Sequence, residues 1–130
     1  MQSSNQLSSP LATQALSEQQ TQHPCLITVA PNGARRGKAD HPALPITPTE
    51  MVEEVAACAD AGAAMVHLHA RTPEGRHSLE IDDNATMLRQ VSDQLGERLV
   101  VQLTTEAVGI YQPAQQMTLI RELQPEAASF

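Results

Sequence analysis

The sequence predicts an α/β fold built on parallel strands. Four short apolar segments alternate with three segments of helical spacing, so the expected order is strand, helix, strand, helix, strand, helix, strand. The strands recur at intervals of roughly 30 to 40 residues, which suits repeated βα units. Two architectures have this pattern, an open doubly wound sheet and a (β/α)₈ barrel. A barrel needs about 250 residues, so four strands correspond to half of one.

The composition argues against several classes of function. The net charge of -7 disfavours nucleic-acid binding, which needs clustered Lys and Arg. Cys25 and Cys58 lack a Cys-x-x-Cys spacing, and we expect both to be reduced thiols. No apolar run approaches the roughly 20 residues that cross a bilayer. The amino terminus lacks the basic and apolar regions of a signal peptide, so we expect a cytoplasmic protein without membrane partners.

The chain is expected to divide into a tail and one domain. Residues 1–23 are rich in Gln, Ser and Thr without an apolar period, which predicts a disordered tail. Residues 24–130 then form the domain. The β-branched, apolar segment 25–30 predicts a strand buried on both faces. The aperiodic segment 35–46, which contains two prolines, predicts a long loop, and such loops are often functional.

Helix signals are clearest in the middle of the chain. Thr47, Pro48 and Glu50 form a capping box that starts a helix, and Gly62 supplies its stop. This helix leads into the next strand, 64–70. A second helix follows, with an apolar stripe, an acidic first turn and a closing glycine; its marks are Ile81, Asp82, Asp83, Ala85, Leu88, Val91, Leu95 and Gly96.

The last third of the chain repeats the pattern. Residues 99–103 predict a third strand. Pro113 suits the first position of a third helix, in which Met117, Ile120 and Leu123 recur at helical spacing. Residues 126–130 are expected to open a fourth strand.

The candidate functional motif is the His-x-His pair of the second strand. Side chains alternate between the faces of a strand, so His67 and His69 point the same way, about 6 to 7 Å apart along the backbone. Two imidazoles so placed can hold a zinc ion. The alternative is a pair of histidines satisfied by hydrogen bonds inside a sheet or barrel. The polar turn 71–75 places them at the carboxyl end of the strand, where α/β folds carry their chemistry.

A set of short motifs gives the chain a family resemblance. They are Asn32-Gly33-Ala34, Leu44-Pro45-Ile46-Thr47-Pro48, Ala61-Gly62-Ala63, His67-Leu68-His69-Ala70-Arg71, Gly75-Arg76 and Gln124-Pro125-Glu126. In this order and spacing, the region from Leu26 to Phe130 resembles the amino-terminal half of the β-keto acid cleavage enzymes. The 3-keto-5-aminohexanoate cleavage enzyme is the best-known member of that family.

The resemblance implies a fold, a cofactor and a reaction. The fold is a (β/α)₈ TIM barrel, of which this chain supplies about the first four strands and three helices. The cofactor is a divalent metal, usually zinc, at the carboxyl ends of the strands. The reaction converts a small-molecule β-keto acid and acetyl-CoA to acetoacetyl-CoA and a new CoA thioester, or is an equivalent acyl exchange. A homo-oligomer is expected for the full-length enzyme.

The resemblance also implies roles for individual residues. His67 and His69 match the metal-binding histidines, and Thr104 and Ser129 match positions that contact substrate. Arg71 is a candidate to orient a neighbouring carboxylate around the metal. The remaining substrate-binding candidates follow the first strand, and they are Asn32 and Arg35.

Two departures from the family modify these expectations. Arg35 stands where the aminohexanoate enzyme has an acidic residue that meets the substrate's ammonium group. A cation there favours a β-keto acid without an amino group. The family's third metal ligand, a glutamate, and its neighbouring arginine and aspartate belong to the other half of the barrel. We therefore expect this chain to be a fragment that is inactive alone. The competing interpretations are an amidohydrolase-like metal enzyme and a non-catalytic α/β binding module.

Overall fold

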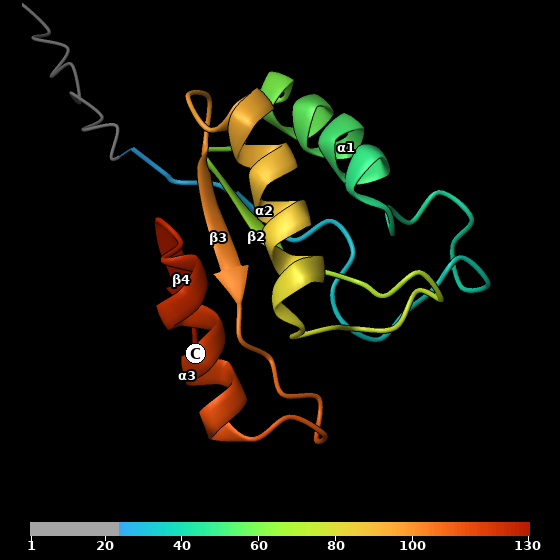
Figure 1. Ribbon diagram of the computed structural model, residues 1–130. Helices are drawn as coiled ribbons and strands as arrows, with labels where there is room; N and C mark the ends of the chain where they lie inside the picture. The colour runs from blue at the N-terminus through green and yellow to red at the C-terminus, as the bar shows by residue number, and fades with distance from the viewer. Residues whose placement is uncertain (1–23) are drawn as a thin grey trace, which may run out of the picture.

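The computed structural model describes residues 24–130, so the expected tail 1–23 lies outside the described residues. Its elements, in chain order, are β1 (Thr28–Val29), α1 (Pro48–Asp60), β2 (Met65–Leu68), α2 (Ile81–Leu95), β3 (Val100–Thr104), α3 (Pro113–Leu123) and β4 (Ala127–Ser129). This is the alternation that the sequence predicts (Figure 1). None of these described helices combines the length and apolar character needed to cross a membrane.

The four strands form one parallel sheet in the order β1-β2-β3-β4. In a doubly wound sheet the strand order reverses at a switch point. Here each strand pairs with the next one in the sequence, and the order never reverses. The arrangement is therefore that of a partial (β/α)₈ barrel, in agreement with the expected fold class.

The helices cover one face of this sheet. Val66 and Leu68 of β2 and Val101 of β3 lie in one buried cluster with side chains of α1 and α2. Leu103 of β3 packs against Leu119 of α3 in a second cluster. Because Val66 pairs with Val101, and Leu68 with Leu103, these strand residues point to the same face. Helices α1 and α2 lie side by side on that face (Figure 1).

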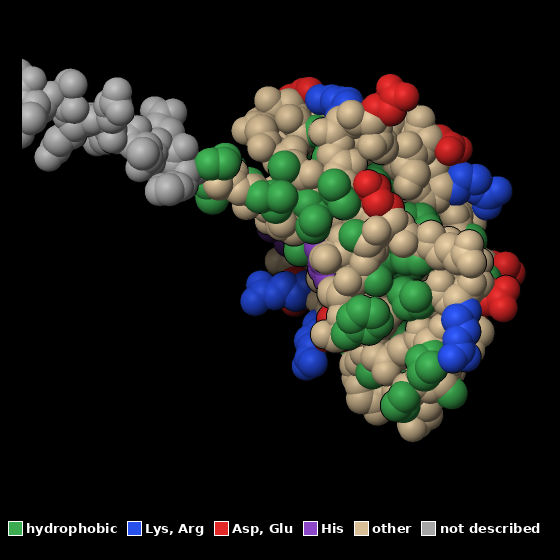
Figure 2. Space-filling model, turned by 90° about the vertical axis from the view of Figure 1, so that its left-hand side faces the viewer, with side chains coloured by type: hydrophobic (Ala, Val, Ile, Leu, Met, Phe, Trp, Pro, Cys, Tyr) green, Lys and Arg blue, Asp and Glu red, His purple; other side chains and the backbone are tan. Residues whose placement is uncertain are grey.

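The opposite face carries the polar strand residues. His67 pairs with Gln102, and Thr104 pairs with Ser129, so all four point away from the helices. In a (β/α)₈ barrel the face without helices lines the barrel interior. Figure 2, a view turned by 90° from Figure 1, shows hydrophobic side chains over much of the surface, and small parts of histidine side chains are visible near one edge. The functional candidates therefore lie on the interior face.

The first strand differs from its prediction. Residues 25–30 were expected to form a strand buried on both faces, but β1 has two residues, and Leu26 and Ile27 are 60% and 52% exposed. The physical reason is that β1 is an edge strand that pairs only with β2 within the described chain. An edge strand loses one row of hydrogen bonds and the neighbours that would cover its side chains.

Helix α1 begins as the sequence predicts. The Thr47 hydroxyl accepts a hydrogen bond from the Glu50 N–H, and the Glu50 carboxylate accepts one from the Thr47 N–H, at 3.3 and 3.0 Å. Gly62 follows the helix with a φ of 103°, which residues with a side chain rarely adopt. The expected start and stop are both confirmed.

We expect the replacement Glu50→Gln to destabilise the protein in a pH-dependent way. A hydrogen bond from Lys38, together with the N–H groups of Thr47 and Ile46, lowers the pKa of Glu50 to about 2. A lowered pKa in the folded state stabilises the protein above the unfolded pKa, and this stability is lost as the pH falls through the folded value. Urea denaturation at pH 7 should show a loss of about 1 kcal/mol.

The loss caused by Glu50→Gln should shrink between about pH 4.5 and pH 2. Glu53→Gln, which changes an exposed carboxylate of the same helix, is the control and should have little effect. A loss of stability that is the same at pH 7 and pH 2 would contradict the role of the ionised Glu50.

Helices α2 and α3 match their predicted positions, and α2 buries Val91 and Leu95 as expected, but the other buried positions differ from the expected ones. The buried side of α2 is formed by Asn84, Met87, Val91 and Leu95, and the buried residue of α3 is Leu119. Met117, placed in the expected stripe of α3, is 51% exposed. Asn84 is buried because its amide donates to the carbonyls of Ser78 and Glu80, a contact that hydrophobic periodicity does not reveal.

Candidate active site

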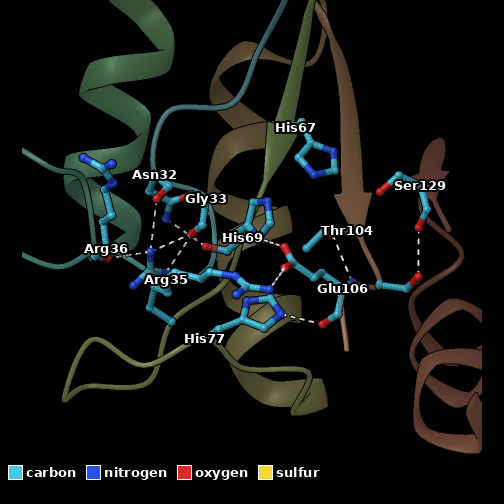
Figure 3. A network of polar contacts seen from close by, with 12 residues as sticks. Asn32, Gly33, Arg35, Arg36, His67, His69, His77, Thr104, Glu106 and Ser129 are labelled. Carbon is cyan, nitrogen blue, oxygen red and sulfur yellow. Dashed lines mark hydrogen bonds and ion pairs between the residues drawn. The ribbon is translucent and has the colours of Figure 1, made fainter. Parts of the chain in front are cut away.

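The two histidines of the His-x-His motif lie next to each other on the interior face. Their ring centroids are 4.8 Å apart, and the rings meet edge to face (Figure 3). Nδ1 of His67 lies 2.8 Å from Oε1 of Gln102, its partner on β3. The amide oxygen is an acceptor, so Nδ1 carries the hydrogen and Nε2 keeps its lone pair. His67 therefore presents a nitrogen that can bind a metal.

His69 is a buried, neutral imidazole. Only 5% of the residue is exposed, and its Nδ1 has no hydrogen-bond partner within the described chain. Burial, together with the neighbouring His67, His77 and Arg71, lowers the pKa of His69 to about 3. The contact of 3.7 Å between Nδ1 and Oε2 of Glu106 is therefore not an ion pair at pH 7. A neutral ring is the form that binds metal ions.

Glu106 and His77 complete this group of polar side chains. The Glu106 N–H donates to the Thr104 hydroxyl at 3.1 Å, and its carbonyl lies 2.8 Å from Nε2 of His77. His77 is buried, and that burial lowers its pKa. Its ring lies 5.4 Å from the ring of His69. Figure 3 shows the Glu106 carboxylate beside the His69 ring, with the His77 ring nearby.

Arg71 organises the loop that follows β1. Its guanidinium donates to the carbonyls of Asn32, Gly33, Arg36 and Gly75, at distances between 2.6 and 3.1 Å. The residue is 7% exposed. Its hydrogen bonds within the described residues thus go to backbone carbonyls, whereas the sequence suggested a carboxylate. The arginine supports the site by holding the loop against the end of β2.

The other site candidates are brought to the same end of the sheet. The Asn32 side chain donates to the His69 carbonyl at 2.9 Å, which ties the loop after β1 to the histidine. Arg35 is 81% exposed and lies 3.7 Å from Oε1 of Glu106. Thr104 is 2% exposed, and Ser129 is half-buried beside it on β4. Each candidate therefore follows, or ends, one of the four strands.

Sequence reasoning missed three residues of this site. Gln102 is a polar residue among the apolar residues of β3, and it lies two positions before Thr104, so strand alternation could have identified it. Glu106 lies two positions after Thr104, so the same alternation points to it, but more weakly because it lies beyond the end of β3. His77 lies between the polar turn 71–75 and the helix that begins at Ile81, where no local pattern marks it. Its place is set by an isolated bridge with Arg71.

The donor set fits a divalent metal in its chemistry and supplies part of the coordination. Zinc prefers neutral imidazole nitrogens, and both rings lie on the interior face, where Gln102 contacts His67. Within residues 24–130, no group of three or more His, Cys, Asp and Glu side chains could hold a metal ion. His67 and His69 would therefore supply two ligands, and a metal site would need at least one more from outside this group.

Comparison with known proteins identifies the family. The family model described as beta-keto acid cleavage enzyme matches residues 24–130, which is the whole described part of the chain. The chain belongs to the β-keto acid cleavage enzyme family. The resemblance inferred from the sequence motifs is thereby confirmed.

Several curated members of the β-keto acid cleavage enzyme family are similar to this chain. The 3-oxoadipate:acetyl-CoA acetyltransferase of Cupriavidus necator is 44% identical over 68 residues, 52% of this chain and 24% of that protein. The 3,5-dioxohexanoate:acetyl-CoA acetone transferase of Paraburkholderia graminis is 34% identical over 110 residues, 84% of this chain and 35% of that protein. The 3-keto-5-aminohexanoate cleavage enzyme of Fusobacterium nucleatum is 29% identical over 100 residues, 77% of this chain and 34% of that protein.

Two solved structures of ObcA share the fold. One is a ternary complex with a C4-CoA adduct and oxalate, with a TM-score of 0.55 and 24% identity. The other is the apo structure, with a TM-score of 0.52 and 26% identity. Each match covers 68% of this chain and 23% of ObcA. The chain thus spans between about a quarter and a third of the length of the relatives it matches.

Proposed function

We propose that this chain provides the metal-binding part of an enzyme that exchanges acyl groups between a β-keto acid and acetyl-CoA. The observation that supports this proposal is the position of His67 and His69, which match the family's two metal-binding histidines. They lie together on the interior face, at the carboxyl end of β2, with Thr104 and Ser129 ending the next two strands. Family membership favours acyl exchange over an amidohydrolase-like hydrolysis or ligand binding without chemistry. A cytoplasmic, homo-oligomeric enzyme stays our prediction.

The products follow from the balance of atoms. One acetyl-CoA brings one CoA, so acetoacetyl-CoA and a second thioester cannot both form, and that part of the sequence-based expectation is corrected. The balanced equivalent breaks the bond between the keto carbon and its neighbouring methylene carbon. The keto acyl group then joins the CoA sulfur, and the acetyl group joins the two-carbon remainder as acetoacetate. The relatives' names, which contain acetyl-CoA, support this co-substrate.

The residues of this chain have separate tasks in the proposal. His67 and His69 would hold the zinc ion. When bound, zinc acts as a Lewis acid that stabilises negative charge on a keto oxygen. Thr104 and Ser129 offer hydroxyl groups to the substrate from the ends of β3 and β4. Asn32 holds the loop after β1 against His69, so that the loop can contact the same substrate.

Arg35 selects the substrate in this proposal. Its guanidinium is 81% exposed, at the edge of the site, where it can reach an anionic or neutral group. A cation there repels a substrate that carries an ammonium group. We therefore propose a β-keto acid without an amino group, and a dicarboxylic one fits best. The similarity to a protein named for 3-oxoadipate supports this choice.

A turnover assay with acetyl-CoA and zinc tests both proposals. The assay compares a dicarboxylic and an aminated β-keto acid and follows new CoA thioesters by chromatography. It is run on the purified chain and on the chain joined to the carboxyl-terminal part of the Cupriavidus relative. We expect no exchange by the chain alone, since it holds two metal ligands within its described residues, and exchange with the dicarboxylic acid by the joined protein.

The variant Arg35→Glu sharpens this assay. It should lower the preference of the joined protein for the dicarboxylic over the aminated acid by about tenfold, the equivalent of 1.4 kcal/mol. Arg89→Glu, which reverses a charge on α2, is the control. Preference of the unaltered protein for the aminated acid would contradict the role of Arg35. A joined protein that folds and binds zinc, yet forms no thioester from either acid, would contradict the proposed reaction.

A further inference from the structure

The two candidate metal ligands have matching environments on their Nδ1 atoms. Nδ1 of His67 faces the side-chain oxygen of Gln102, 2.8 Å away. Nδ1 of His69 faces the Glu106 carboxylate, 3.7 Å away, and has no hydrogen-bond partner within the described residues. In both cases an oxygen from the end of β3, or from just beyond it, approaches the same ring atom. Figure 3 shows the carboxylate lying against the edge of the His69 ring.

The neighbouring Glu106 carboxylate determines which ring nitrogen of His69 carries the hydrogen. A neutral imidazole has one N–H group and one lone pair, on different nitrogens, while an ionised carboxylate only accepts hydrogen bonds. Beside the Glu106 carboxylate, the favourable form of His69 has its hydrogen on Nδ1. Its lone pair then lies on Nε2, as it does in His67. Both rings then have their lone pair on the equivalent nitrogen.

The position of Glu106 is fixed by contacts on both sides of its own backbone. Its N–H donates to the Thr104 hydroxyl, and its carbonyl accepts from Nε2 of His77. The remaining carboxylate oxygen, Oε1, faces Arg35 at 3.7 Å. The backbone of Glu106 is thus held in place, and its carboxylate lies between His69 and Arg35. Such an arrangement suits a residue that orients another side chain.

We propose that Glu106 is a positioning residue that holds His69 in the Nδ1–H form and so directs Nε2 to the metal. Carboxylate partners of metal-binding histidines fix the orientation of the ring and strengthen it as a ligand. The contact of 3.7 Å needs to shorten by less than 1 Å to become a hydrogen bond. The metal part of this inference rests on the proposed function, whereas the hydrogen position of His69 can be measured without a metal.

Nuclear magnetic resonance of the ¹⁵N-histidine-labelled chain tests the proposal directly. Long-range ¹H–¹⁵N correlations at pH 7 report which ring nitrogen carries the hydrogen. We expect Nδ1–H for His69 in the unaltered chain and a shift toward Nε2–H in Glu106→Ala. His67, whose Nδ1 faces Gln102, should keep its form in both and serves as the internal control. Glu122→Ala, which removes an exposed carboxylate of α3, should change neither ring.

Zinc titration by calorimetry provides the second readout. We expect Glu106→Ala to weaken zinc binding by about 10- to 100-fold. Glu106→Gln keeps an oxygen that can accept from Nδ1–H, so it should retain the Nδ1–H form and lose about threefold at most. Circular dichroism of each variant establishes that it is folded. The Gln variant keeps the test valid if the Ala variant does not fold.

The outcomes separate this proposal from the proposed function. Unchanged His69 resonances and unchanged zinc affinity in Glu106→Ala overturn the role of Glu106. A Gln variant as impaired as the Ala variant also overturns it, because the carboxylate would then be needed for its charge or as a metal ligand. If the joined protein binds no zinc but Glu106→Ala shifts the His69 hydrogen, Glu106 is a positioning residue and the metal site is refuted.

Discussion

Replacing His67 and His69 together by alanine is expected to abolish zinc binding by this chain, with a fall in affinity of at least about 100-fold. The two imidazoles are the candidate ligands, and no group of three or more metal-binding side chains lies within the described residues. Their rings are 4.8 Å apart on the interior face, so one ion can reach both. Calorimetric titration with zinc chloride measures the loss. The joined enzyme should lose its turnover in parallel.

His41→Ala is the matched control for the double variant. His41 is an exposed histidine of the loop before α1, outside the site, so its removal should leave zinc binding unchanged. Retention of both the bound metal and the turnover in the His67→Ala, His69→Ala protein would contradict the metal site. The single variants should each bind zinc more weakly than the unaltered chain, since each keeps one ligand.

Arg71→Met is expected to lower the free energy of unfolding by about 3 to 5 kcal/mol. Arg71 is 7% exposed, and its guanidinium donates to the carbonyls of Asn32, Gly33, Arg36 and Gly75. Methionine can fill much of the volume but has no donor, so those carbonyls lose their partners. Urea denaturation followed by circular dichroism measures the change. Hydrogen exchange should show the largest loss of protection in residues 32–37.

Two further variants separate the geometry of Arg71 from its charge. Arg71→Lys keeps the charge, but an ammonium group cannot span four carbonyls as a planar guanidinium does, so it should recover less than half of the stability. Arg76→Met is the control, because Arg76 is 80% exposed, and it should change stability by less than about 0.5 kcal/mol. If Arg71→Met also changes the free energy of unfolding by less than about 0.5 kcal/mol, the structural role of Arg71 is contradicted.

The helix boundaries could be predicted because their causes are local. Thr47, Pro48 and Glu50 determine the start of α1 through contacts within one helical turn. Gly96 marks the end of α2 by a similarly local contact, in which its N–H donates to the Ser92 carbonyl, whereas α2 begins without a side-chain cap. β1 was predicted less well because the exposure of Leu26 and Ile27 depends on the strands and helices around them, which the segment itself does not specify.

The sequence by itself determined the alternation of strands and helices, and it placed His67 and His69 on one face, because both follow from the period of a single element. Only the tertiary structure decided which groups face those rings. Gln102 reaches His67 through the register of two strands, and Glu106 reaches His69 across 37 residues of chain. Arg71 likewise meets its carbonyls across a folded loop. Such partners are selected by packing between distant segments, which no local pattern records.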